Sequence, residues 1–180
     1  KGSTEIPTDG FVISASGKKK DQLAAMLKVG IRVSFERKTT SATGSPLSAS
    51  VLAAEDATAG VPQIIRDGKL NITILEEKSS KDFSETRHPR TAFAILKDGN
   101  VLLAVFDGRQ PGHSIGVSLQ EMAEILLPLG ADVAMNFDGG GSTTMFLDGK
   151  IVNKVSDKEG ERPVSDALIV TLRKSAVRDR

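Results

Sequence analysis

Three of the six Asp-Gly pairs in the chain each lie between two runs of strand-like composition. They are Asp67-Gly68, Asp98-Gly99 and Asp148-Gly149. Asp-Gly favours tight hairpin turns, in which the central residues adopt a positive φ that few other residues tolerate. In the clearest case, the apolar run 91–96 leads through Asp98-Gly99 into the apolar run 101–106. We therefore expect a hairpin there that is central in a sheet and buried.

Other segments have patterns that predict additional strands and two helices. Residues 18–28 place apolar side chains on one helical face, and Ser118 and Glu121 have the spacing of a capping box before an apolar stripe that ends at Gly130. The remaining strands are expected at residues 31–35, 131–137, 143–147, 150–153 and 166–172. Since helices are few and hairpins dominate, the sequence predicts one α+β domain with a mixed, mostly antiparallel sheet.

Composition excludes several classes of protein and of site. Lys and Arg number 24 against 23 Asp and Glu, which is not the basic excess of a nucleic-acid-binding protein. No apolar run is long enough to span a membrane. The chain has no Cys and only two His, so thiolate zinc sites are excluded and any metal site would consist mainly of oxygen ligands. We assign no metal and no cofactor.

The segment most indicative of chemistry is Asn136-Phe-Asp138 followed by Gly139, Gly140, Gly141 and Ser142, between two predicted strands. Successive glycines leave backbone amides unobstructed, so such a loop can approach a phosphate or a sugar hydroxyl closely. No Lys follows the glycines and no helix comes next, so the segment is not a nucleotide-binding P-loop. A flexible turn without function is the alternative.

Four further motifs accompany this loop along the chain. They are Arg87-His-Pro-Arg90-Thr91, Asp107-Gly108-Arg109, Gly112-His-Ser114-Ile-Gly116 and Ser156-Asp157-x-x-Gly160-Glu161-Arg162. Together with the glycine loop, they resemble the phosphodiester glycosidase family, and weaker similarity extends over almost the whole chain.

This resemblance implies a hydrolase that cleaves the glycosidic bond of a sugar-1-phosphodiester and releases a sugar such as N-acetylglucosamine. It also implies that residues 1–180 form the larger C-terminal part of the family domain, without its N-terminal portion. A separate N-terminal chain that completes the domain is one explanation, and the other is a missing portion of the same chain. Export or a place in the cell envelope is a further expectation from the resemblance.

A sugar phosphodiester carries a fixed negative charge, which the planar guanidinium of arginine binds well. The expected substrate-binding residues combine arginines, small polar side chains and the glycine amides. They are Arg90, Thr91, Arg109, Ser114, Asn136, Gly139, Gly140, Gly141, Ser142 and Arg162. For each single arginine, a surface ion pair is an equally good interpretation.

Cleavage at the anomeric carbon passes through an oxocarbenium-like state, which glycosidases stabilise with carboxylates. The expected catalytic residues are Asp138 first, then Glu161, then Asp107, and Asp157 is a further candidate. Because phosphate is already a good leaving group, one essential carboxylate is enough. The alternative for Asp138 is that it caps the glycine turn through backbone amides.

Two functions other than glycoside hydrolysis fit the same residues. One is a noncatalytic module of the cell envelope that binds phosphoglycans without turning them over. The other is a phosphodiesterase that cuts at phosphorus. The combination of carboxylates with arginines around one loop favours the enzyme over the binding module, because a binder of anions has less need for acidic groups.

Overall fold

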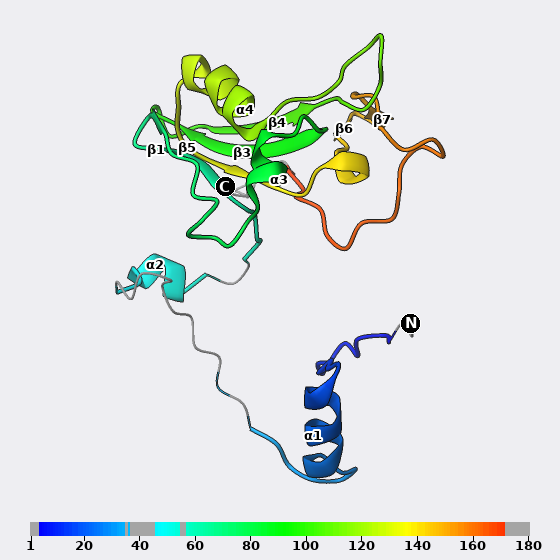
Figure 1. The fold of residues 1–180 in the computed structure, drawn as a ribbon. Helices are drawn as coiled ribbons and strands as arrows, with labels where there is room; N and C mark the ends of the chain where they lie inside the picture. Colours follow the sequence, from blue (N-terminus) through cyan, green and yellow to red (C-terminus); the bar gives the residue numbers. More distant parts are fainter. Residues whose placement is uncertain (1–3, 35, 37–45, 55–56, 172–180) are drawn as a thin grey trace, which may run out of the picture. The chain divides into compact units, whose positions relative to one another are not determined.

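The computed structural model describes residues 4–34, 36, 46–54 and 57–171. It divides into two compact units, Lys1–Glu55 and Asp56–Arg180 (Figure 1). The first unit contains the helices α1 (Lys18–Met26) and α2 (Ala49–Leu52), and no residue of either helix is buried. In the described ranges, no helix is both long and apolar enough to cross a membrane.

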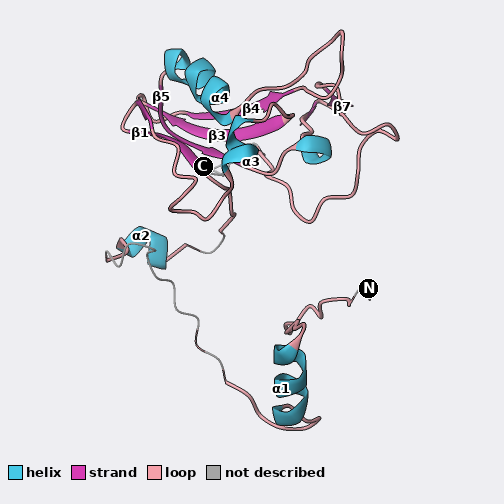
Figure 2. Ribbon diagram, viewed as in Figure 1, coloured by secondary structure: helices cyan, strands magenta, loops and turns pink. Residues whose placement is uncertain are grey.

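The second unit is built on a five-stranded sheet with the strand order β2-β1-β5-β3-β4 (Figure 2). The bounds are β1 Gln63–Arg66, β2 Lys69–Leu70, β3 Arg90–Leu96, β4 Val101–Phe106 and β5 Ala131–Asn136. Each neighbouring pair is antiparallel. A separate hairpin pairs β6 (Phe146–Leu147) with β7 (Lys150–Ile151). The predicted α+β fold with a mostly antiparallel sheet is confirmed.

All three of these Asp-Gly pairs form the hairpin turns that the sequence predicts. Asp67 and Gly68 both have positive φ, 51° and 64°, between β1 and β2, and Asp148 and Gly149 repeat this between β6 and β7 with 48° and 81°. At the third turn only Gly99 has a positive φ, and the Asp98 carboxylate accepts a hydrogen bond from the Asn100 amide at 3.0 Å. Local sequence therefore determines where the chain reverses direction between these antiparallel strands.

Some predicted strands are shorter or absent, and one lies elsewhere in the sheet. The strands expected at 31–35 and 166–172 do not form over residues 31–34 and 166–171, and Phe35 and Leu172 lie outside the described residues. Only 146–147 of the segment 143–147 is a strand. β4 lies at the end of the sheet, not at its centre, and its side chains are only half-buried. Alternation of apolar and polar residues favours a strand, but a strand forms only where a neighbouring strand is present to pair with it.

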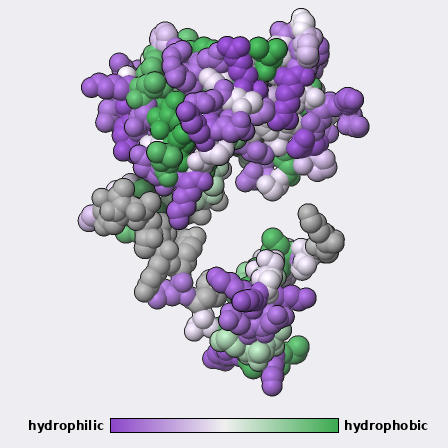
Figure 3. Space-filling model, in the orientation of Figure 1, coloured by the Kyte–Doolittle hydropathy of each residue, from purple (hydrophilic) through white to green (hydrophobic). Residues whose placement is uncertain are grey.

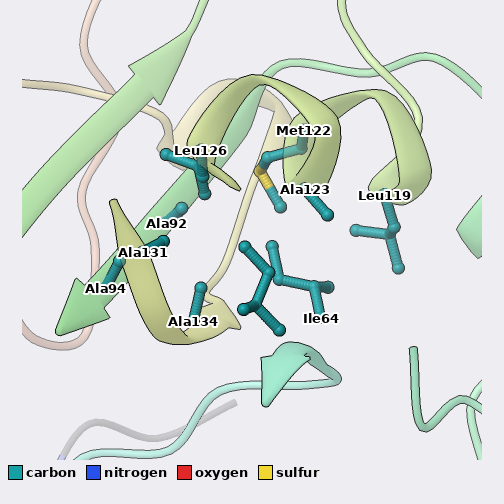
Figure 4. Packing of buried hydrophobic residues seen from close by; sticks show 10 residues of the cluster. Ile64, Ala92, Ala94, Leu119, Met122, Ala123, Leu126, Ala131 and Ala134 are labelled. Atoms are coloured by element: carbon teal, nitrogen blue, oxygen red, sulfur yellow. The ribbon is translucent and has the colours of Figure 1, made fainter. Parts of the chain in front are cut away.

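The core lies between one face of the sheet and helix α4 (Leu119–Leu126), which packs across that face (Figures 1 and 4). Leu119, Met122 and Leu126 of the helix are almost fully buried. They face small residues of the sheet, which include Ala92, Ala94, Ala131 and Ala134. The surface of the second unit shown in Figure 3, in contrast, is mostly hydrophilic. Alanines on the sheet allow the helix to approach closely, so the large helical side chains fill the space between the two layers.

Helix α4 begins with the capping box that the sequence predicts. The Ser118 hydroxyl accepts a hydrogen bond from the Glu121 amide at 3.2 Å, and the Glu121 carboxylate accepts one from the Ser118 amide at 2.8 Å. The same carboxylate accepts from Nε of Arg87 at 2.9 Å. These bonds lower the pKa of Glu121 to about 2, with the hydrogen bond from Arg87 as the largest cause. Glu121 thus connects the start of α4 to the segment that precedes β3.

Replacing Leu126 with Ala is expected to lower the free energy of unfolding by about 2–5 kcal/mol, because it leaves a cavity between α4 and the sheet. Ile125→Ala is the matched control, since the neighbouring Ile125 is 46% exposed and should cost under about 1 kcal/mol. Urea unfolding followed by circular dichroism measures both values. Equal losses in the two variants would contradict the packing described above.

The pKa of Glu121 predicts a specific pH dependence of stability. A carboxylate with a lowered pKa stabilises the fold above its ordinary pKa of 4.5, and this contribution disappears as the pH falls toward about 2. Glu121→Gln should therefore be less stable than the wild type at pH 7, and the difference should shrink steadily below pH 4.5. Thermal unfolding at several pH values measures this, and a difference that does not change with pH would argue against the ionic contact with Arg87.

Candidate functional site

The glycine loop leaves β5 after Asn136 and folds back onto the residue that precedes β3. The amide of Gly140 donates a hydrogen bond to the carbonyl oxygen of Pro89 at 2.9 Å. One short 3-10 turn, Gly140–Ser142, follows, and the Ser142 amide donates to the Gly139 carbonyl at 3.2 Å. The loop is therefore a fixed turn at the C-terminal end of β5, and its position is set by a backbone contact to Pro89, which precedes β3.

A side chain at each of the three glycines would meet a different neighbour. A Cβ at Gly139 would lie 2.6 Å from the Pro89 carbonyl oxygen, and backbone at that position cannot move aside. Gly140 has φ +62°, and a Cβ there would lie 2.9 Å from Nη1 of Arg109. A Cβ at Gly141 would overlap the guanidinium of Arg162 and the carboxylate of Asp157. Glycine fits these three positions because a side chain would meet backbone at Gly139 and charged side chains at Gly140 and Gly141.

Arg109 and Arg162 therefore approach the glycine loop from two distant motifs. Arg109 follows β4 and has φ +60°, an uncommon backbone conformation for a residue with a side chain. Arg162 forms an ion pair with Asp157, 2.6 Å from Nη2 to Oδ2. This hydrogen bond lowers the pKa of Asp157, burial opposes it, and the charges of Arg162 and Arg109 lower it further. Both arginines thus lie within electrostatic reach of one carboxylate.

Asp138 is exposed, and its Oδ1 accepts a hydrogen bond from the Gly139 amide at 2.9 Å. Its charge is also one of the causes that raise the pKa of Arg162, after the hydrogen bond and charge of Asp157. The capping contact, which the sequence analysis gives as the alternative to catalysis for Asp138, is therefore present, and Asp138 also lies within electrostatic reach of Arg162. A single capping bond leaves Oδ2 of Asp138 available at the surface of the loop.

Asn136 and Thr91 lie beneath the loop. The Asn136 side chain is buried, and its Nδ2 donates to the Val61 carbonyl at 2.5 Å. The carbonyl oxygen of that side chain is buried and has no hydrogen-bond partner in the described ranges. Thr91 donates from its hydroxyl to Thr143 at 3.3 Å, which connects β3 to the end of the glycine turn. These contacts hold the base of the loop.

Arg90 has different partners from those that the sequence suggests. Its side chain is almost fully buried, and it donates to the carbonyls of Phe83 at 2.6 Å, Thr86 at 3.0 Å and Val117 at 3.3 Å. The guanidinium also lies 4.5 Å from the centre of the Phe83 ring. Burial and the charge of Arg109 lower its pKa to about 10. These contacts assign Arg90 to the support of the site, and not to its surface.

Asp107 and Ser114 also make contacts within the protein. The Asp107 carboxylate accepts hydrogen bonds from His113 at 2.8 Å, the Lys154 amide at 3.0 Å and Asn153 at 3.2 Å. Ser114 donates to the Asp107 carbonyl at 2.6 Å. Burial raises the pKa of Asp107, but these hydrogen bonds outweigh it and leave the pKa below its usual value. Asp107 therefore connects β4 to two loops. Ser142, in the glycine loop, is half-buried, and Glu161, next to Arg162 in the sequence, is exposed.

His88 contacts the cluster, although the sequence analysis assigns it no role. Its Nδ1 accepts a hydrogen bond from Nε of Arg109 at 3.4 Å and lies 3.3 Å from Nη2. In the sequence, His88 is marked only by its position inside the Arg87-His-Pro-Arg90 motif. That position does not identify Arg109 as its partner. The described residues contain no group of three acidic, His or Cys side chains that could hold a metal.

Comparison with known proteins identifies the family. The sequence matches the phosphodiester glycosidase family over residues 2–171. The chain belongs to this family. That match includes every motif of the glycine-loop cluster and extends across both structural units.

Individual relatives of this chain match over shorter stretches. N-acetylglucosamine-1-phosphodiester alpha-N-acetylglucosaminidase of Bos taurus is 33% identical over 107 residues, 54% of this chain and 20% of the relative. The SPbeta prophage-derived uncharacterized protein YomE of Bacillus subtilis (strain 168) is 35% identical over 85 residues, 47% of this chain and 13% of the relative. The chain thus spans at most a fifth of the length of these curated relatives.

Among solved structures, the zebrafish N-acetylglucosamine-1-phosphodiester alpha-N-acetylglucosaminidase catalytic domain, auto-inhibited by its pro-peptide, is similar to this chain. It is 27% identical with a TM-score of 0.48, and the match covers 59% of this chain and 36% of that domain.

Gly139→Ala tests the contact between the glycine loop and Pro89. The added methyl group should destabilise the fold by about 1–3 kcal/mol, because it meets a backbone carbonyl. Ser142→Ala in the same loop is the control and should stay within about 0.5 kcal/mol of wild type, since its hydroxyl makes no hydrogen bond with the described residues. Chemical denaturation measures both, and an unaffected Gly139→Ala would place the loop away from Pro89.

Proposed function

We propose that this phosphodiester glycosidase hydrolyses the glycosidic bond of a sugar-1-phosphodiester and releases a free sugar such as N-acetylglucosamine. The main support is that two arginines and two carboxylates from separate parts of the chain lie around one glycine loop. They are Arg109, Arg162, Asp138 and Asp157. Family membership and the names of the mammalian relatives support the reaction class.

Arg109 and Arg162 are the proposed ligands of the phosphodiester. Both side chains are exposed, and both lie against the glycine turn. The Gly139 amide already donates to Asp138 and the Gly140 amide to Pro89, so of the three glycine amides only that of Gly141 makes no hydrogen bond with the described residues. Two guanidinium groups and one amide match the charge and the acceptor geometry of a phosphodiester anion. The ion pair with Asp157 orients Arg162 for this task.

Asp138 is the proposed catalytic carboxylate. Its free oxygen allows it to stabilise positive charge at the anomeric carbon and to accept a proton. In the net reaction, the oxygen of water bonds to the anomeric carbon and the bond from that carbon to the phosphate oxygen breaks. The electron pair remains on the phosphate, and one proton of the water passes to the carboxylate, which then releases it to solvent. A phosphate leaves readily as an anion, so this step needs no separate general acid.

Asp138→Asn should reduce the release of N-acetylglucosamine from a synthetic N-acetylglucosamine-1-phosphodiester by at least about 100-fold, the scale of a lost acid–base group. The matched control is Asp148→Asn, which changes an exposed Asp in a hairpin turn and should retain full activity. The released sugar is measured by chromatography, and calorimetry with the intact diester checks that Asp138→Asn still binds. Undiminished turnover in Asp138→Asn would remove this residue from the mechanism.

The wild-type protein separates the three candidate functions. In water labelled with ¹⁸O, attack at the anomeric carbon places the label in the sugar, as we expect. Label in the phosphate would instead show a phosphodiesterase that cuts at phosphorus. Binding of the diester without any hydrolysis would indicate a noncatalytic phosphoglycan-binding module.

A further inference from the structure

His88 occupies a fixed position between the two parts of the cluster. Its backbone forms an isolated bridge with Val117, with hydrogen bonds of 3.2 Å and 3.1 Å in the two directions. A Cβ at Gly116 would overlap the His88 backbone, and a Cβ at Gly108 would lie 2.6 Å from the nitrogen of Pro89. The strand segment 88–89 is therefore held between the turn that carries Arg109 and the glycine loop.

The side chain of His88 contacts Arg109, which forms no ion pair with a carboxylate of the described residues. Arg109 Nε donates to His88 Nδ1 at 3.4 Å, and Nη2 lies 3.3 Å from the same nitrogen. The same guanidinium lies against Gly140, where an added Cβ would meet Nη1 at 2.9 Å and Cζ and Nη2 at 3.2 Å. The group that contacts His88 is therefore also the group that covers the glycine loop, so the histidine contact helps to fix the guanidinium in that position.

The contact requires a neutral imidazole. Arg109 is a donor only, so Nδ1 of His88 must carry a lone pair and the proton must lie on Nε2. The groups that face His88 favour this state: burial lowers its pKa most, the charges of Arg109 and Arg90 lower it further, and only Asp82 raises it. A protonated His88 would lose its acceptor and place a second cation beside Arg109.

We infer that His88 is a positioning residue, which orients the Arg109 guanidinium toward the glycine loop through a hydrogen bond accepted by Nδ1. The inference rests on the proposed role of Arg109 as a phosphodiester ligand. It assigns His88 no contact with the substrate. Because the bond exists only with the neutral imidazole, the orientation of Arg109 is retained above the pKa of His88 and is released below it.

Two substitutions of His88 separate positioning from packing. His88→Asn places the amide oxygen near the position of Nδ1 and so retains an acceptor, whereas His88→Leu has similar size without an acceptor. The probe is inorganic phosphate, and the full chain is titrated at pH 8 by calorimetry. His88→Leu should bind phosphate about 3- to 10-fold more weakly, the range of one hydrogen bond, and His88→Asn should stay within about twofold of wild type. Equal weakening in both variants would overturn the inference.

The second measurement does not depend on any ligand. The NMR signal of the Arg109 Nε–H group should be sharp and protected from exchange in the wild type and in His88→Asn, and weak in His88→Leu. On acidification, the wild-type signal should be lost as His88 protonates, while the signal of His88→Asn persists because an amide does not titrate in this range. A wild-type signal that matches His88→Leu at all pH values would overturn the inference. Absence of phosphate binding by wild type alongside the expected NMR pattern would overturn the proposed anion site and leave the role of His88 intact.

Discussion

The buried guanidinium of Arg90 holds together the segments on which the site depends. It donates to the carbonyls of Phe83, Thr86 and Val117, which come from helix α3 (Lys81–Glu85), its C-terminal end and the loop before α4. Burying a cation is costly unless its donors are satisfied, and here three carbonyl dipoles and the face of the Phe83 ring compensate for the lost hydration. Loss of this side chain would remove one donor from each of three carbonyls, of which that of Val117 would keep the His88 amide, so its effect would extend beyond a single contact.

The position of Arg90 explains how distant motifs meet. The residues on either side of it have backbone roles: His88 bridges to Val117, Pro89 accepts the Gly140 amide, and Thr91 accepts the Phe137 amide at 2.8 Å. The start of β3 therefore serves as the shared support for the turn that carries Arg109 and for the glycine loop. The charged groups at the surface of the site are exposed and adjustable, but the backbone that presents them is tightly constrained. This division between a rigid support and solvent-facing side chains is typical of functional loops.

The sequence predicted the parts of this arrangement that depend on local chemistry. The three Asp-Gly turns, the capping box at Ser118 and the glycine loop each follow from the conformational preference of a few adjacent residues. The sequence could not predict what Arg90 contacts. An arginine next to a strand can bind a substrate or backbone carbonyls, and the neighbouring residues do not show which of these partners it has. The strands expected at 31–35 and 166–172 failed for a related reason: alternation shows which face of a strand is apolar and does not identify a partner. His88 was overlooked because its function requires knowledge of Arg109, twenty-one residues later.

The electrostatic balance of the cluster follows from the same geometry. Asp157 is paired with Arg162, and Asp138 lies within reach of the same guanidinium, so two carboxylates share the field of Arg162. Arg109 instead contacts a histidine whose pKa is lowered, and a neutral imidazole takes no charge away from it. If both arginines were neutralised by carboxylates, little positive potential would remain for an anionic substrate. A histidine partner orients Arg109 while it preserves that charge, which is the property that binding of a phosphodiester beside two acidic residues requires.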